Sequence, residues 1–519
     1  MIALAAPRPR VRGLGILAAL LGWQALAMVL EGSYLLAGPV EVAGWLWANA
    51  GLMARALGVT LQAAALGFLW GNLAAVGLAV AVLLVPRAER LVSALALLVF
   101  CLPLVATGPI LRVLYGPGMG PQITLAALAV YFTTYLTLMV GLRATPASWL
   151  DLVRSYGQGR LTELYRIRVR AALPYFIAGL QIAAPAAFLG AMVGEFTGAE
   201  RGMGVLVIRA MRGLDLPATW ALACVAAAVA VAAYAALGWL GRRGGTPPAL
   251  ILAAPVARGG RGGSPLLRLG LLVGVVLALW QGGMALFDLN PFFAKRPGDV
   301  WDFLVTAPGA ATNRATLLAA FIETLMLTVP GYFIGLALGA GLAAAMVLWP
   351  RVAATALPLA IALRSVPIIT TAPLIVIALG RGAAGTITIV AVMIFFPTLV
   401  ACLQGLRQTP GQVLDLFDSY ASSRWQRMVH AQIPAMLPAF FASARMAVPA
   451  AILAATTAEW LATGAGIGSL MAMTASTSAY GMLWSAIVLI SVTAALAYVA
   501  AEMLERAVLR VYASEHLAR

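Results

Sequence analysis

The sequence predicts an all-α, polytopic membrane protein of about twelve transmembrane helices, arranged as two parallel six-helix repeats with pseudo-twofold symmetry. The chain of 519 residues is 62% hydrophobic and only 10% charged, whereas a soluble globular domain is about 45–50% apolar and about 25% charged. Apolar runs long enough to cross roughly 30 Å of hydrocarbon as helix recur along its whole length. In addition, residues 60–242 match residues 324–506 without a gap.

Prolines show this duplication most clearly, because composition alone does not place them in register. Six of the eight prolines in 60–204 have a partner at the equivalent position of 324–468, and proline is only 29 of 519 residues. The matched prolines are Pro86, Pro103, Pro109, Pro146, Pro174 and Pro185, which fall on Pro350, Pro367, Pro373, Pro410, Pro438 and Pro449. The period is therefore a whole domain. We expect a first membrane domain at 1–243, a cytoplasmic linker at 244–265 and a second membrane domain at 266–519.

Six apolar spans are expected in each half. They lie near 14–31, 60–85, 90–113, 122–142, 174–194 and 217–240, and near 268–287, 325–349, 354–379, 385–405, 438–458 and 482–503. The match continues before the ungapped block with a shifted register, since Trp23 answers Trp280 and Pro39 answers Pro297. Arginines precede the first span, as they do in a secretory signal peptide. We expect an uncleaved helix, because the second copy has the same span internally.

Arginine sets the expected orientation. Of the 34 Lys and Arg residues, all but Lys295 are Arg, and most fall on one side if both termini and the linker are cytoplasmic, as the positive-inside rule requires. The net charge of +16 is then a topology signal and not a sign of nucleic-acid binding. The expected location is the bacterial inner membrane, with the lipid bilayer as solvent.

Few residues are available for metal or catalytic chemistry. The chain has three Cys and two His, with no ligand spacing among them, so neither a metal site nor a catalytic cluster is expected.

The segment between the fourth and fifth spans is long, amphipathic and present twice. Each copy begins Thr-Pro-x3-Leu-Asp, at 145–151 and 409–415. We expect a helix, a turn at Gly157 or Ala421, and a short second helix that ends where a proline starts the fifth span. The alternative is a polar re-entry loop of the kind that is common in any carrier. The residues singled out are Asp151, Ser155, Tyr156, Gly157 and Arg160, and Asp415, Ser419, Tyr420, Ala421 and Arg424.

These two segments resemble the cytoplasmic coupling segment of ABC importer permeases, with Asp151 and Asp415 in the place of the motif's Glu. Residues 363–382, 194–207 and 458–471 resemble the nitrate, sulfonate and taurine branch of that family. Both Ala-Ala pairs of the motif are replaced, and Ala421 stands where the family has Gly. If that turn needs a positive φ, Ala costs about 1 kcal/mol or more there.

The resemblance implies two permease domains fused in one chain. It implies a cytoplasmic ABC ATPase dimer that binds ATP and Mg²⁺ and docks on the coupling segments, and a periplasmic solute-binding protein. The sequence agrees on one point: a phosphate-binding loop needs a Lys after its glycines, and Lys295 follows Ala294. We therefore expect no ATPase site, no other enzyme activity and no cofactor in this chain.

Charged and aromatic residues within spans are candidate pathway residues, since a charge in mid-span is costly unless it is paired or faces water. Arg364 either lines the pathway or extends its guanidinium to the interface; Phe100, at the matching position, Tyr131 and Phe395 either line it or pack. Glu195 and Glu459, each followed by a Gly-x-Gly loop, are expected at the external end as gate or docking residues, or as solvated carboxylates. The loop glycines are Gly202, Gly204, Gly466 and Gly468.

The expected function is the translocation pathway of an ATP-driven importer. Its cargo would be a small solute, an anion such as a sulfonate or nitrate, or a vitamin or pyrimidine precursor. The alternative is an ion-coupled secondary transporter with two six-helix halves. That class favours Asp or Glu in mid-span for proton coupling, and none is clearly placed so here.

Overall fold

The computed structural model describes residues 9–30, 36–116, 118–145, 147–159, 162–244, 265–349, 352–353, 375–376, 379–380 and 382–512. These residues form helices joined by short turns, and no strand occurs among them. The predicted all-α class is confirmed.

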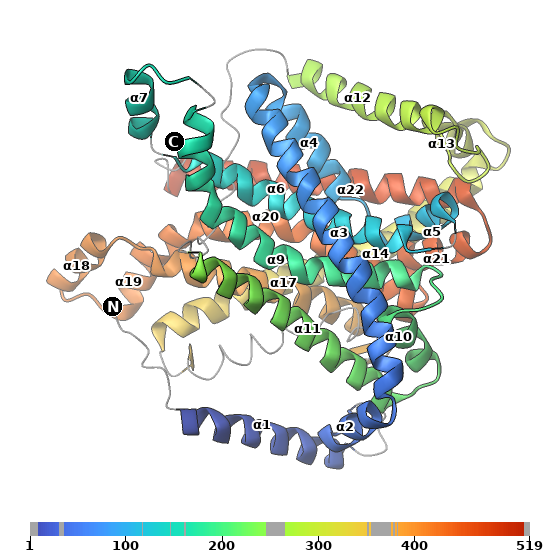
Figure 1. Cartoon of the computed structure of the whole chain (residues 1–519), viewed down its shortest axis with the longest axis horizontal. Coiled ribbons are helices and arrows are strands. Elements are labelled where there is room, and N and C mark those ends of the chain that lie inside the picture. The colour runs from blue at the N-terminus through green and yellow to red at the C-terminus, as the bar shows by residue number, and fades with distance from the viewer. Residues whose placement is uncertain are drawn as a thin grey trace.

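The helices of the first half and of the second half follow the same order (Figure 1). The first half has α1 (Pro9–Val29), α2 (Pro39–Ala48), α3 (Ala50–Leu84), α4 (Glu89–Phe100), α5 (Leu104–Tyr115), α6 (Gly120–Arg143), α7 (Ala147–Ser155), α9 (Val169–Phe196), α10 (Met203–Arg212) and α11 (Leu216–Arg243). The second half has α12 (Pro265–Leu286), α13 (Pro297–Trp301), α14 (Ala310–Leu348), α17 (Ala383–Arg407), α18 (Gly411–Ser419), α19 (Arg424–Arg427), α20 (Ile433–Ala458), α21 (Gly466–Ser476) and α22 (Tyr480–Tyr512).

Eight helices among the described residues are long and apolar enough to cross a membrane. They include α3, α6 and α11 of the first half and α14, α17 and α22 of the second; the other two contain α9 and α20. The apolar parts of α1 and α12, at Leu20–Val29 and Gly270–Leu286, are shorter. Most of the predicted span 354–379 lies outside the described residues.

The predicted span 90–113 is not one straight helix. Residues Pro86–Phe100 and Leu104–Tyr115 meet at 90°. Pro103 causes the break, because it disfavours helical geometry at the preceding residue and is itself extended, with ψ 103°. A period-based reading of apolar residues does not detect this corner.

The second helix of each coupling segment continues into the fifth span, so the prediction that Pro174 and Pro438 begin the span is wrong. One apolar helix runs over Glu163–Phe196 and another over Arg424–Leu461, each with a π-helical turn near its start. Within a membrane, neighbouring helices and local π adjustments accommodate an internal proline. The coupling segments are therefore attached directly to the ends of spanning helices.

Glycines allow α3 to pack closely on α6, and α14 on α17, as the repeated Gly-x3-Gly spacing predicts. A methyl group at Gly71 would lie 2.7 Å from the backbone oxygen of Ala127. A methyl group at Gly335, the equivalent position of the second copy, would lie 2.7 Å from that of Ala391. The same helix pair is thus built twice, in the same register.

Tryptophans attach the first helix of each half to the last one. The rings of Trp23 and Trp220 lie 5.8 Å apart, and those of Trp280 and Trp484 lie 5.5 Å apart. The indole N–H of Trp23 donates to the Ala37 oxygen. That of Trp280 donates to the Lys295 oxygen, which confirms the shifted register before the ungapped block.

The molecule has two distinct ends. In Figure 1, α7, α18 and α19 project from the left end, whereas α2, α5, α10, α13 and α21 gather at the right end. Between these ends the two halves share side chains: Cys101 and Ile110 belong to a core cluster with Met471 and Ile487 of the second half. The halves therefore form one packed body.

Candidate functional site

The first coupling segment ends α7 with a Schellman turn. The N–H of Gly157 donates to the oxygen of Arg154 at 2.9 Å, and the N–H of Gln158 donates to that of Val153 at 3.3 Å. Gly157 has φ 65°. Glycine is the residue that this position favours.

The second segment repeats the same turn with alanine. The N–H of Ala421 donates to the oxygen of Asp418 at 3.0 Å, and that of Ser422 donates to Phe417 at 3.0 Å. Ala421 has φ 50°. The turn thus adopts a positive φ in both copies, and the alanine costs about 1 kcal/mol there.

Matched side chains point away from the helical bundle in both segments. Leu152 and Tyr156 are 56% and 75% exposed, and Leu416 and Tyr420 are 56% and 79% exposed. Their spacing places each pair on one face of its helix. The hydroxyl groups of Ser155 and Ser419 each donate to a backbone oxygen three residues earlier, at 2.7 Å.

The acidic positions of the motif are also exposed. The side chain of Asp151 is 71% exposed and lies 3.6 Å from Arg154, while Asp415 is exposed on α18. Arg424 begins α19, and Arg160 lies outside the described residues. Each segment thus exposes a Leu, a Tyr and an Asp outside the helical bundle.

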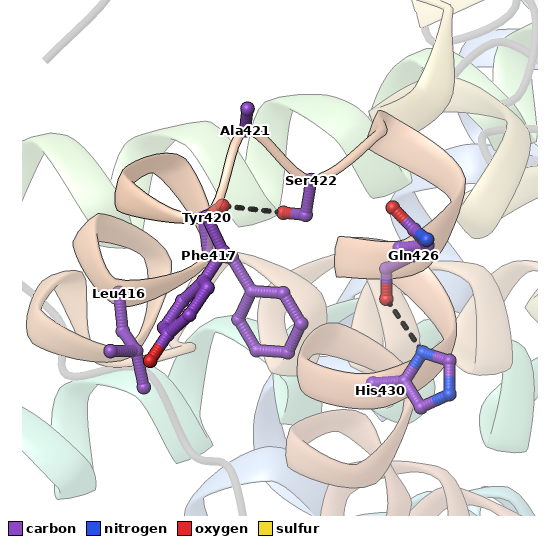
Figure 2. Close-up of a pocket in the computed structure, with 7 residues that line it drawn as sticks. All are labelled: Leu416, Phe417, Tyr420, Ala421, Ser422, Gln426 and His430. Atoms are coloured by element: carbon purple, nitrogen blue, oxygen red, sulfur yellow. Dashed lines mark hydrogen bonds between the residues drawn. The ribbon is translucent and has the colours of Figure 1, made fainter.

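The second segment also contains an open groove of about 480 Å³ between α18 and the helix that follows. Figure 2 shows the rings of Phe417 and Tyr420 on one side, and Gln426 and His430 on the other. The imidazole Nδ1 of His430 lies 3.1 Å from the oxygen of Gln426. The groove adjoins the exposed face of α18 and is lined by both apolar and polar side chains.

At the opposite end, Glu195 belongs to a buried arrangement that we call the external clamp, because the sequence predicts that this end is external. Its Oε1 accepts from the Thr60 hydroxyl at 2.6 Å, and its Oε2 accepts from the Gly204 N–H at 2.6 Å. The Thr60 oxygen in turn accepts from the Met203 N–H at 2.9 Å. Glu195 is 1% exposed. The clamp therefore joins α3, the end of α9 and the start of α10.

The second external clamp repeats this arrangement at the equivalent positions of the second copy. Glu459 Oε2 accepts from the Thr324 hydroxyl at 3.0 Å and from the Gly468 N–H at 2.8 Å. The Ile467 N–H donates to the Thr324 oxygen at 2.8 Å. Glu459 is also 1% exposed, so neither carboxylate is solvated. The second copy adds Glu323, whose Oε2 accepts from the Gly466 N–H at 3.1 Å.

The loop glycines make room for these carboxylates. Gly202 and Gly466 have φ 131° and 79°, and a methyl group at either would overlap the neighbouring glutamate side chain. At Gly204 a methyl group would lie 2.6 Å from the Met192 oxygen. The Gly-x-Gly spacing is thus required by the clamp itself.

The candidate pathway residues that the structure describes are in contact with other side chains. Tyr131 is buried, and its hydroxyl donates to the Ala96 oxygen of α4. Phe100 stacks on Phe132 with ring centroids 4.5 Å apart, and Phe395 packs beside a buried cluster of the second half. Arg364 lies outside the described residues, so its role stays a prediction.

Sequence reasoning missed the partners of Glu195 and Glu459. Thr60 and Thr324 stand far before those carboxylates in the chain, and no local pattern connects them. The signal that was available is the duplication, since a Thr, a Glu and a Gly-x-Gly loop recur at the same separations. Among the described residues, no group of three or more His, Cys, Asp or Glu side chains could hold a metal ion.

Comparisons with known proteins agree with this arrangement. The model of a family described as binding-protein-dependent transport system inner membrane component matches residues 71–244 and again 335–510. A probable ABC transporter permease protein of Haemophilus influenzae is 34% identical over 225 residues, which are 42% of this chain and 89% of that protein.

Two further relatives also match less than half of this chain over most of their own length. The formylaminopyrimidine transport permease protein ThiX of Halalkalibacterium halodurans is 26% identical over 41% of this chain and 86% of its own length. The taurine transport system permease protein TauC of Escherichia coli is 27% identical over 45% of this chain and 85% of its own length. The chain belongs to the family of binding-protein-dependent transport system inner membrane components, as the permease subunit of an ABC importer with two permease domains in one polypeptide.

Proposed function

We propose that this chain forms the complete translocation pathway of its importer and docks one subunit of a separate ATPase dimer on each coupling segment. Two observations support this: both segments project from one end of the molecule (Figure 1), and both present the same exposed Leu and Tyr. ATP and Mg²⁺ belong to the ATPase partner. On the distribution of arginine we place the docking end on the cytoplasmic side.

The opposite end receives solute from a periplasmic binding protein. The external clamps attach α10 and α21 to the ends of the fifth spans, so each helix follows the movement of its span. Because Glu195 and Glu459 are buried, their role is to position these helices, and the exposed loop residues contact the binding protein.

The cargo is a small solute, for which we propose an anion such as a sulfonate or nitrate. Taurine, in the name of one relative, favours this class, and formylaminopyrimidine, in the name of another, keeps a pyrimidine precursor as the second candidate. If Arg364 faces the pathway, Arg364→Lys should retain part of the uptake and Arg364→Gln should lose most of it. Normal uptake by Arg364→Gln would remove the support for an anion.

Site-directed crosslinking tests the docking proposal. In a chain whose three native cysteines are replaced by alanine, Ser155→Cys and Ser419→Cys should each capture a co-expressed cognate ATPase. Ser476→Cys is the matched control, because Ser476 is exposed on α21 at the opposite end. Capture from neither coupling position in an intact complex would refute the docking proposal.

Reporter fusions test the orientation. A fusion at Gly260 in the linker and one after Arg519 should both report a cytoplasmic location. An external signal at either site would contradict the proposed topology.

A further inference from the structure

An ion pair joins the first coupling helix to the base of the fifth span. Arg154 lies on α7, and Glu163 lies where the spanning helix begins. Their Nε and Oε2 atoms are 3.4 Å apart. The Glu163 side chain is 8% exposed and also accepts from Arg168 at 2.6 Å. The pair closes the turn that contains Gly157.

The second copy contains an ion pair at the same two positions with the charges exchanged. In the register of the duplication, Asp418 of α18 corresponds to Arg154, and Arg427 corresponds to Glu163. Asp418 and Arg427 form an ion pair of their own. The coupling helix therefore supplies the cation in one half and the anion in the other. The link between helix and span is the same in both.

Other ion pairs between described residues have no counterpart across the duplication. Their matching positions hold residues that cannot pair, such as Gln, Gly, Ala or two like charges. Examples are Glu89–Arg143, Arg445–Glu505 and Glu502–Arg506, which correspond to Ala353–Arg407, Gln181–Gly241 and Gly238–Arg242. Within the described part of the chain, only the pair of positions 154 and 163 is bridged in both halves, so what recurs is the link and not the sign of either charge.

We propose that Arg154–Glu163 and Asp418–Arg427 are two forms of one positioning bridge, which fixes each coupling helix relative to its fifth span. This inference rests on the proposed ATPase docking, because the bridge would carry movement from a docked ATPase into the membrane. The Schellman turn alone fixes only the end of the coupling helix. With the bridge, helix and span move as one unit instead of bending at the turn.

A charge-exchange cycle in the second copy tests the bridge. The variants are Asp418→Arg, Arg427→Glu and the double variant, reconstituted in proteoliposomes with the cognate ATPase. Each single variant places like charges together and should lower solute uptake per ATP hydrolysed by about fivefold. The double variant restores an opposite pair, in the arrangement that the first copy already uses, and should return within about twofold of the original chain.

Two controls separate the bridge from other effects. Glu502→Gln removes an ion pair within α22 that has no counterpart and should leave the uptake per ATP unchanged. Chymotrypsin cleavage after the exposed Tyr420 reports the geometry of the turn without any ATPase. It should be faster in both single variants and normal in the double variant.

The outcomes distinguish the two proposals. A double variant no better than the worse single variant, in both uptake and cleavage, would overturn the bridge. If the unmodified chain binds no ATPase, the docking proposal fails, and the cleavage measurements still decide whether the bridge fixes the turn. In the first copy, Arg154→Asp/Glu163→Arg/Arg168→Gln reproduces the residues of the second copy and should retain uptake, whereas Glu163→Arg alone should not.

Discussion

After the duplication the external clamps kept their side chains, whereas the coupling segments changed several of theirs. The clamps keep the same residues in both halves: a Thr and a Gly-x-Gly backbone N–H that both donate to a Glu carboxylate. The coupling segments keep the same backbone turn, yet Arg154 corresponds to Asp418 and Gly157 to Ala421. Buried polar groups must find their hydrogen-bond partners inside the chain, whereas exposed groups are under no such constraint from the fold. The difference indicates that the fold constrains the side chains of the clamps more strongly than those of the coupling segments.

Removing a clamp carboxylate should have the largest effect that both halves share. Glu195→Leu or Glu459→Leu leaves a backbone N–H buried without an acceptor, at a cost of about 1–3 kcal/mol, and the Thr hydroxyl keeps only its bond to the backbone oxygen four residues earlier. Thermal unfolding of the detergent-solubilised protein should show a similar loss of stability for both variants. Glu200→Gln is the control, since Glu200 is an exposed carboxylate in the same loop. A loss of stability in only one of the two variants would contradict the equivalence of the clamps.

Breaking the buried ion pair of the second half should cost more, but in that half alone. Arg445 and Glu505 lie 2.9 Å apart, each with a side chain 3% exposed. Arg445→Gln leaves an uncompensated buried carboxylate and should cost about 3–5 kcal/mol. Arg445→Gln/Glu505→Gln should recover most of that loss, which the same unfolding measurement checks. An equal loss in the single and double variants would show that packing, and not charge, holds α20 to α22.

The two turns should respond in opposite directions to exchange of their residues. Gly157→Ala places a side chain at φ 65° and should destabilise the turn by about 1 kcal/mol, while Ala421→Gly should stabilise it by a similar amount. Gly157→Ala should nevertheless support transport, because the second copy already has Ala. Hydrogen exchange at the two turns would measure both effects. Equal exchange in all variants would contradict the left-handed geometry.

Charge reversal at the exposed Asp positions should have the smallest effect on the fold, and an unequal effect on assembly. Asp151→Arg faces Arg154 and should weaken ATPase binding, whereas Asp415→Arg faces Asp418 and gains an attraction within α18. Co-purification of the ATPase with each variant measures the difference. Equal and mild losses would count against a docking role for these positions.

Much of this architecture could be predicted from single positions in the sequence. Prolines in register gave the two domains, and the small residue at 157 and 421 located the turn. The corner at Pro103 and the unbroken helix through Pro174 could not be predicted, because neighbouring helices decide whether a proline bends or is accommodated. The clamps depend on partners that lie far apart in the chain. The bridge could not be predicted for another reason: a search for identical residues does not find a pair whose charges have been exchanged.

The shared core has a consequence for biosynthesis. Ile110 packs in one cluster with Ile487, so the corner formed by α4 and α5 reaches its final contacts only after most of the chain has been made. At about 5–20 residues per second, the interval between these two residues is roughly 20–80 s. During that time the first half stays in the membrane with part of its packing surface uncovered. Because the two halves are fused, the second half, which covers this surface, is always synthesised directly after the first.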